Sequence, residues 1–217
     1  RTWLPGDQRG RGFSFSGPRL GTDSRLRGPV SEDKGGSTPV FGHGLTGTKP
    51  LTVGGLTRGD GVTTPSTGVV ANAWGGRGWN ETSVEDAILD DDTITFSMTP
   101  APGTQLTIQS LVFNYRVSRN SNGVQTGPNT AMIYYKIGEG DFIEMEAVGL
   151  RDSSTTGATA TVEIEGNYFD LEGITGETLT FRIVPFVAPL PEPEPPPLSG
   201  GSLVFYGPMT GTDITVN

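Results

Sequence analysis

The stretch Thr93-Ile94-Thr95-Phe96-Ser97-Met98 alternates polar and apolar side chains without a break. Successive side chains of a β-strand point to opposite faces of a sheet, so Ile94, Phe96 and Met98 are predicted to face a core. The Thr and Ser side chains between them are predicted to face solvent. This pattern is typical of a strand in a sheet that is buried on one side only.

The longer run Gln105–Val117 shows the same alternation, but its phase changes once. Leu106 and Ile108 occupy even positions, whereas the large apolar residues between 111 and 117 occupy odd positions. A change of phase within one extended run predicts a bulge or kink near residues 109 and 110.

Short apolar runs of this kind recur along the chain at the spacing of an all-β sandwich. Gly and Pro account for 33 and 17 of the 217 residues, so turns should be frequent and long helices few. We therefore predict an all-β fold with two sheets packed as a β-sandwich. The expected strands are Leu51–Leu56, Gly68–Trp74, Thr93–Met98, Gln105–Val117, Thr130–Ile137, Phe142–Val148, Ala158–Glu165, Thr178–Val187, Ser202–Tyr206 and Thr212–Val216.

One short helix is expected after the second of these strands. Thr82-Ser83-Val84-Glu85 has the spacing of a capping box, and Val84, Ala87 and Ile88 then form an apolar stripe. The acidic run Asp90-Asp91-Asp92 would end this helix after about two turns.

The same acidic run, Asp90, Asp91 and Asp92, is a weak candidate for a calcium site, because calcium prefers oxygen ligands. The run lacks the interleaved spacing and the glycine of a calcium-binding loop. The alternative is a solvated turn between helix and strand, which is the usual role of a charge run.

The chain is predicted to form one domain preceded by an arm. Residues 1–50 are rich in Gly and Pro and lack a helical period, with one strand candidate at 12–16. Residues 51–217 are predicted to form the β-sandwich. Its Pro-Glu segment, residues 189–199, is predicted to be a long loop between two strands, because too few residues follow it to form a second domain.

The arm and the β-sandwich region also differ in net charge. Residues 1–49 contain eight basic and four acidic residues, a net charge of +4, and the remaining seven basic and twenty acidic residues give −13. We expect the arm to dock on an acidic surface of its own chain or of a neighbour. No nucleic-acid partner is expected, since the acidic body would repel phosphates. The residues expected to act in the arm are Arg1, Trp3, Arg9, Arg11, Phe13, Phe15, Arg19, Arg25 and Arg27.

The composition argues against most catalytic chemistry. The chain has no Cys and one His, which excludes thiol nucleophiles, disulfides and sites that need several His or Cys ligands. No spacing of carboxylates singles out a catalytic pair. No apolar run approaches the roughly 18 residues of a membrane span. We therefore expect no enzymatic activity, no cofactor and no membrane span.

Four aromatic residues are candidates for binding carbohydrate: Trp74, Trp79, Tyr134 and Tyr135. Rings on an exposed sandwich face can stack on sugar rings. The alternative is that these rings pack in the core.

The tripeptide Arg58-Gly59-Asp60 matches the sequence that integrins bind when a loop tip displays it. Matches of three residues are frequent by chance, so we do not expect this role.

The order of several motifs resembles a β-sandwich module of exported bacterial surface proteins in planctomycetes, cyanobacteria and Bacteroidetes, which often carry C-terminal sorting signals. The motifs are Leu56-Thr57-Arg58-Gly59, Ala73-Trp74-Gly75-Gly76-Arg77-Gly78-Trp79, Leu111-Val112-Phe113-Asn114-Tyr115-Arg116, Thr180-Phe181-Arg182 and Gly201-Ser202-Leu203-Val204-Phe205. The resemblance covers residues 51–217. It implies an extracellular, jelly-roll-like module without catalytic residues.

Two functions from different classes remain open. The first is a structural subunit of an extracellular filament or surface layer, a homo-oligomer or polymer joined through the arm and the sheet edges. The second is a carbohydrate-binding or adhesive module of a larger secreted protein, with polysaccharide as its partner. Burial of the arm against another chain favours the first function, and an exposed aromatic face favours the second.

Overall fold

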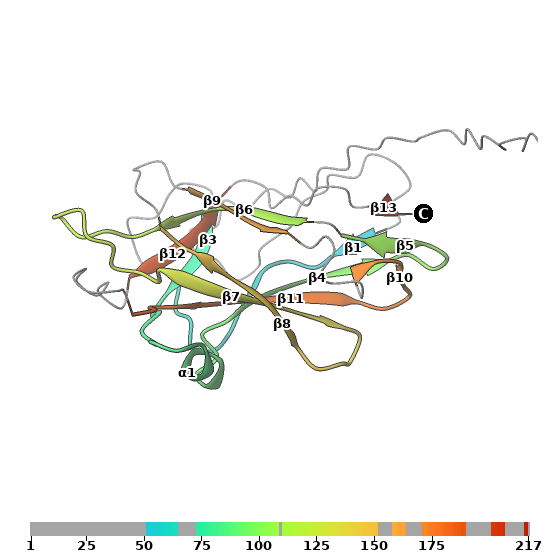
Figure 1. The fold of residues 1–217 in the computed structure, drawn as a ribbon, viewed down its shortest axis with the longest axis horizontal. Helices are drawn as coiled ribbons and strands as arrows, with labels where there is room; N and C mark the ends of the chain where they lie inside the picture. Colours follow the sequence, from blue (N-terminus) through green and yellow to red (C-terminus); the bar gives the residue numbers. More distant parts are fainter. Residues whose placement is uncertain are drawn as a thin grey trace, which may run out of the picture.

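The computed structural model describes residues 51–64, 73–108, 110–151, 158–163, 171–189, 201–206 and 215–216. In this part of the chain, antiparallel strands form three sheets, accompanied by one short helix (Figure 1). The predicted all-β sandwich is confirmed. The arm, residues 1–50 with its strand candidate at 12–16, and residues 190–200 of the Pro-Glu loop lie outside the described residues.

The largest sheet has six strands. Five of them follow the order β1-β4-β11-β7-β8, and β2 pairs with β4 on the same side as β1. The strands are β1 (Leu51–Val53), β2 (Thr57–Arg58), β4 (Ile94–Pro100), β7 (Thr130–Ile137), β8 (Ile143–Gly149) and β11 (Leu179–Phe186).

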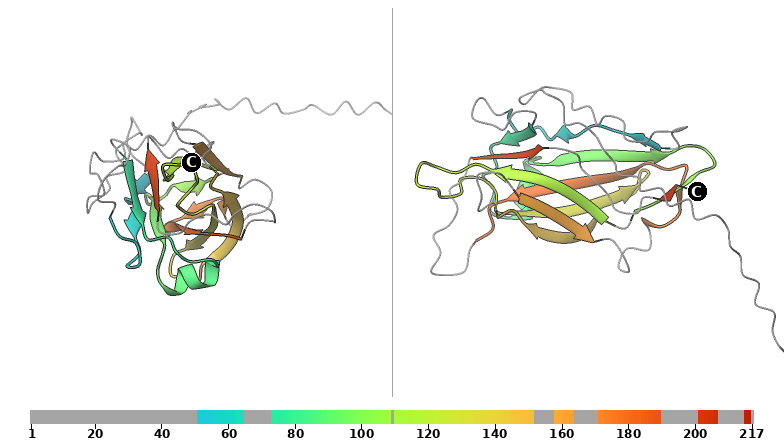
Figure 2. Two further views of the ribbon diagram at one scale, coloured as in Figure 1. Left: turned by 90° about the vertical axis from the view of Figure 1, so that its left-hand side faces the viewer. Right: turned by 90° about the horizontal axis from the view of Figure 1, so that it is seen from above.

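A four-stranded sheet in the order β3-β12-β6-β9 forms the opposite layer, and three short strands in the order β10-β5-β13 form a small third sheet. Figures 1 and 2 show the two larger sheets as facing layers, with the helix α1 on the outer side of the six-stranded sheet. The elements are β3 (Ala73–Arg77), β6 (Ser110–Val117), β9 (Ala158–Glu163), β12 (Ser202–Tyr206), β10 (Ile174–Thr175), β5 (Gln105–Thr107), β13 (Thr215–Val216) and α1 (Val84–Leu89).

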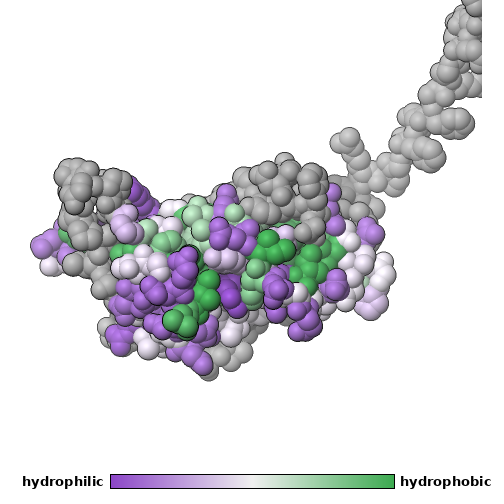
Figure 3. Space-filling view, turned by 60° about the horizontal axis from the view of Figure 1, so that its bottom comes forward, coloured by the Kyte–Doolittle hydropathy of each residue, from purple (hydrophilic) through white to green (hydrophobic). Residues whose placement is uncertain are grey.

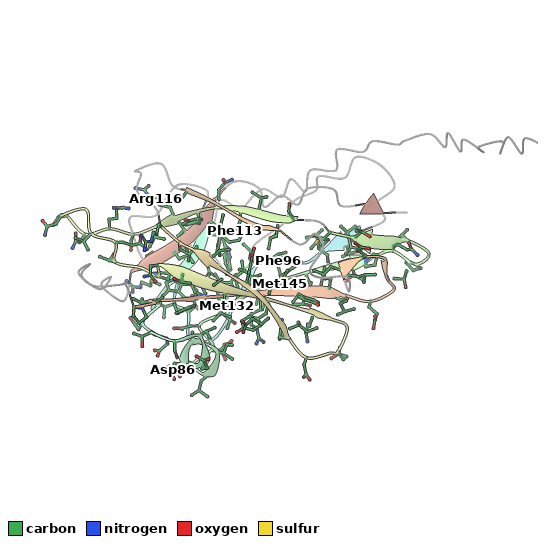
Figure 4. The ribbon with its side chains drawn as sticks, viewed as in Figure 1. Asp86, Phe96, Phe113, Arg116, Met132 and Met145 are labelled. Atoms are coloured by element: carbon green, nitrogen blue, oxygen red, sulfur yellow. The ribbon has the colours of Figure 1, made fainter. Side chains whose placement is uncertain are left out.

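The core lies between the two layers and is built around two aromatic pairs. Phe96 and Phe181 are register partners in the six-stranded sheet, and their rings stack with centroids 5.2 Å apart. Phe113 and Phe205 of the opposite sheet meet edge to face at 5.4 Å. Figure 4 shows Phe96 and Phe113 between the layers. Ile94, Phe96 and Met98 are all buried, so the inward face predicted from alternation is confirmed.

The change of phase near residue 109 marks the place where the chain moves from one sheet to another. β5 pairs with β10 and β13, whereas β6 pairs with β12 and β9. Leu106 and Leu111 are both buried although they differ in parity. The predicted break is therefore present, but it separates two strands of different sheets rather than bending one strand.

Helix α1 begins one residue later than its sequence pattern predicted. Ser83, not Thr82, is the N-cap: its Oγ accepts a hydrogen bond from the Asp86 backbone N–H at 3.1 Å and donates to the Asp86 carboxylate at 2.8 Å. Of the expected apolar stripe only Ala87 is buried, while Ile88 is 37% exposed. The helix thus attaches to the sheet by a narrow contact and leaves much of its surface in solvent.

Candidate functional site

The aromatic residues proposed to bind carbohydrate are mostly part of the core. Trp74 and Trp79 are fully buried, and Tyr135 is only 2% exposed. Trp74 sits on β3 opposite Phe205 of β12, so its ring belongs to the inner face of the four-stranded sheet. The prediction that these three rings form an exposed platform for sugar is therefore wrong. Tyr134 alone among the four lies on the outer side of its strand and is partly exposed.

Arg58 is held against β3 and is not displayed on a loop tip. Its Nε donates a hydrogen bond to the Gly75 carbonyl at 2.6 Å, and its guanidinium lies 4.2 Å from the centre of the Trp74 ring. This cation–π contact couples strand β2 to the opposite sheet. Arg58 therefore has a structural role between β2 and β3.

The acidic run after α1 forms the cap that ends the helix. The Asp92 backbone N–H donates to the Ala87 carbonyl at 2.8 Å, and the Asp91 N–H donates to the Ile88 carbonyl at 3.2 Å. Asp91 has a φ of 55°. These two bonds and the left-handed residue between them make up a Schellman motif, which satisfies carbonyls at the end of the helix.

The Asp91 carboxylate then fixes the neighbouring loop. Its Oδ2 accepts from the Asp60 backbone N–H at 2.8 Å, and its Oδ1 accepts from the Thr93 hydroxyl at 2.9 Å. Gly59 and Gly61 approach this turn so closely that a methyl group on either would overlap backbone carbonyl oxygens of the acidic run. Glycine is therefore required at both positions where the loop passes the turn.

Asp92 is an unusual member of the run because its side chain is only 4% exposed. Burial, followed by the negative charges of Glu81, Asp90 and Asp91, raises the pKa of Asp92 to about 6. Within the described residues, no group of three or more His, Asp or Glu side chains could hold a metal ion. The calcium interpretation of Asp90, Asp91 and Asp92 thus gains no support from their arrangement, which serves to cap the helix.

The outer face of the six-stranded sheet carries a polar and aromatic group, here called the outer-face cluster: Tyr134, Lys136, Phe142, Glu144 and Arg182. Arg182 of β11 is the register partner of Tyr134 on β7, and Tyr134 is the partner of Glu144 on β8. The Arg182 guanidinium lies 3.6 Å from the centre of the Phe142 ring, and the Lys136 ammonium lies 5.3 Å from it. The adjacent strands β7 and β11 thus present two cations around the ring of Phe142, which directly precedes β8.

Partial burial changes the proton affinities in this cluster. Burial, and then the charge and hydrogen bonding of Glu144, raise the pKa of Tyr134 above its usual value. The Tyr134 hydroxyl donates to the Glu144 carboxylate at 3.4 Å. Burial lowers the pKa of Arg182. At neutral pH Tyr134 is therefore a neutral hydrogen-bond donor beside a charged acceptor.

A second group lies next to this cluster on helix α1. We call it the α1 surface: Glu85, Asp86, Ile88, Leu89 and Asp90, all of them exposed. Leu89 is the most exposed of the large apolar residues described, at 81%. Helix α1 contacts β11, the strand that carries Arg182, which places the α1 surface near the outer-face cluster. Figure 3 turns this side of the molecule forward and shows hydrophobic areas set among hydrophilic residues.

Reasoning from sequence missed Phe142, Lys136 and Arg182. A signal for Arg182 was present, because it lies between the inward residues Phe181 and Ile183 and so had to face outward. The contact with Phe142 depends on which strands pair, which no single strand pattern specifies.

No family model, curated protein or solved structure matches the chain. Among the described residues, no helix is both long and apolar enough to cross a membrane. The arm residues Arg1, Trp3, Arg9, Arg11, Phe13, Phe15, Arg19, Arg25 and Arg27 lie outside the described residues.

Proposed function

We propose that this chain is a non-enzymatic structural subunit of an extracellular assembly, either a filament or a surface layer. One observation carries the proposal: the basic arm, with a net charge of +4, leads directly into β1, an edge strand of the largest sheet. The body that follows has a net charge of −13. An arm rooted at an edge and opposite in charge to the body is suited to contact a neighbouring copy.

The sheet edges supply the second set of contacts in this proposal. β1 and β2 share one edge of the six-stranded sheet but contain only three and two residues. β8 at the other end of the order has seven residues and an exposed Ile143, 46% accessible. A longer edge strand offers more backbone N–H and C=O groups to an added strand, so β8 is the better edge for pairing.

The extracellular location is part of the proposal and rests on the resemblance to exported surface modules. The absence of Cys agrees with a fold that does not depend on the redox state of its surroundings.

Deleting residues 1–48 and measuring particle size by analytical ultracentrifugation tests the proposal. The described core is formed by residues from Leu51 onward, so the shortened chain is expected to keep its β circular-dichroism spectrum. We expect large particles from the intact chain and monomers from the shortened one. If both forms are monomers at the same concentration, the proposal is wrong.

A carbohydrate-binding or adhesive module is the second candidate, and the outer-face cluster favours it. Tyr134 and Phe142 are partly exposed rings, and Lys136 and Arg182 beside them can donate hydrogen bonds to sugar hydroxyl or carboxylate oxygens. Isothermal titration with a panel of neutral and acidic oligosaccharides tests this candidate. Binding that Phe142→Ala abolishes, and that Phe186→Ala does not, would support it, whereas no heat with any saccharide would rule it out.

A further inference from the structure

We infer that the α1 surface is the docking site for the N-terminal arm of a second copy of this chain, so that copies join head to tail. This inference rests on the proposed structural function and names the surface that would receive the arm.

The first support is a helix face that packs against no other element among the described residues. α1 contacts β11 and buries Ala87 completely, but Ile88 is 37% and Leu89 81% exposed. Burying the exposed Leu89 and Ile88 side chains against a partner would lower the free energy of association. While they remain exposed, these side chains contribute little to the stability of their own chain. The arm contains apolar partners of the right kind in Trp3, Phe13 and Phe15.

The second support is charge complementarity. Glu85, Asp86 and Asp90 are exposed on the α1 surface, and Glu81, Asp91 and Asp92 lie close to it. After burial, the negative charges of Glu81, Asp90 and Asp91 are the reason why Asp92 holds its proton more tightly than usual. A basic segment would relieve this repulsion. The arm is the one strongly basic part of the sequence, because eight of the fifteen Lys and Arg residues of the whole chain lie before residue 50.

The position of the arm's root relative to the α1 surface bears on the kind of assembly that arm docking would give. Leu51, the first residue of β1, is the register partner of Pro100 at the end of β4. Asp90, the C-cap of α1, comes just before Ile94, the first residue of β4. Root and docking surface are therefore separated by the length of β4, about 20 Å for seven residues. Figure 1 shows β1 and α1 toward opposite ends of the molecule.

Two copies that exchanged arms reciprocally would close into a two-fold dimer. In the arrangement inferred here, each copy docks its arm on one neighbour and receives the arm of another, so the contact is heterologous. Repeating a heterologous contact that does not close into a ring gives an open filament. A filament built in this way exposes one free α1 surface at one end and one free arm at the other.

Charge reversal in the full-length chain tests the inference. The receptor variant Glu85→Lys/Asp90→Lys changes two exposed side chains, and the arm variant Arg9→Glu/Arg11→Glu reverses two charges of the arm. We expect each variant alone to need a concentration on the order of tenfold higher than the wild type for half-maximal assembly, measured by light scattering. Glu139→Lys/Asp141→Lys is the matched control, since it makes the same charge change on the exposed turn between β7 and β8.

Mixing the two variants shows whether the arm that occupies the α1 surface comes from another chain. An equal mixture of the receptor variant and the arm variant pairs each arm with an oppositely charged α1 surface on another chain, so assembly should return to the wild-type concentration. A single chain carrying all four substitutions should assemble as well. If the four-substitution chain assembles but the mixture does not, the arm binds its own chain and the inference is overturned.

Two further outcomes separate this inference from the proposed function. If the receptor variant assembles like the wild type while deletion of residues 1–48 abolishes assembly, the inference is overturned and the structural function stands. If deletion of residues 1–48 leaves the particle size unchanged, the proposed structural function itself is wrong. Circular dichroism of every variant confirms that the fold is retained before assembly is compared.

Discussion

At the scale of single residues, Asp91 combines two roles that are usually divided between residues. Its φ of 55° places it in the left-handed region, where glycine is the most common residue at the end of a helix. Its carboxylate nevertheless accepts hydrogen bonds from Asp60 N–H and the Thr93 hydroxyl, which glycine could not replace. The position is therefore a compromise between backbone strain and side-chain bonding.

The three substitutions Asp91→Asn, Asp91→Gly and Asp91→Ala separate these roles. Asn tolerates the left-handed region and retains an acceptor, so it should destabilise least. Gly loses both hydrogen bonds, at about 1 kcal/mol each, but relieves about 1 kcal/mol of strain, and Ala loses the bonds without that relief. Urea unfolding should therefore rank their stabilities Asn, then Gly, then Ala. Equal losses for Gly and Ala would show that the backbone conformation contributes nothing.

Asp92 makes stability depend on pH in a direction opposite to that of most carboxylates. Its folded pKa of about 6 lies above the usual carboxyl value of 3.8, so the folded state binds the proton more tightly than the unfolded state. Stability from this group is thus full below pH 3.8 and is lost as the pH rises to about 6. We expect Asp92→Asn to gain up to about 3 kcal/mol relative to the wild type across this window. Urea unfolding at several pH values from 3.5 to 7 measures the gain, and a constant difference would contradict the prediction.

At the scale of elements, the sequence predicted helix α1 but not its first residue. Thr82 and Glu85 have the spacing of a capping box, yet Ser83 and Asp86 have it too, one residue later. The structure uses the later of these two equally good local signals, and the helix that follows packs on β11 and buries Ala87.

Ser83→Ala and Thr82→Ala test this register directly. Ser83→Ala removes the acceptor of the Asp86 backbone N–H and should destabilise the protein by about 1 kcal/mol. Thr82→Ala changes an exposed residue outside the helix and should have almost no effect. Thermal unfolding followed by circular dichroism compares the two. A larger loss of stability for Thr82→Ala than for Ser83→Ala would show that Thr82 is the N-cap, as the sequence pattern predicted.

The strands show the same division between local pattern and long-range packing. Runs with clear alternation, such as Thr93–Met98 and Thr178–Val187, became β4 and β11 with the predicted inward faces. The strand expected at Gly68–Trp74 is described only from Ala73 and continues to Arg77, through Gly75 and Gly76. Glycines weaken a strand signal in the sequence, but here they allow the Leu203 carbonyl and the Val62 side chain to lie against β3.

At the scale of the whole molecule, the two layers and their core could be predicted from the sequence, whereas the candidate surfaces could not. The core depends on the parity of each strand, which the chain carries locally. The outer-face cluster depends on the neighbours β4-β11-β7-β8, which bring Arg182 beside Tyr134 although 48 positions separate them. The exposure of Leu89 depends on how α1 settles on the sheet. Composition did predict the charge opposition between arm and body, because charge counts need no knowledge of pairing.

That opposition makes the proposed assembly sensitive to salt. Each exposed ion pair contributes only about 0 to 1 kcal/mol, so an arm contact needs several pairs acting together. The screening length falls from about 10 Å at 0.1 M salt to about 3 Å at 1 M, which weakens all of these pairs at once. We expect the full-length protein to form large particles in 0.05 M sodium chloride and to dissociate toward monomers at 1 M, as measured by ultracentrifugation. Assembly through β8 edge pairing or apolar burial alone would persist or strengthen at high salt, because neither depends on charge attraction. Particles of unchanged size at 1 M would therefore show that strand pairing or apolar burial, rather than charge attraction to the basic arm, holds the subunits together.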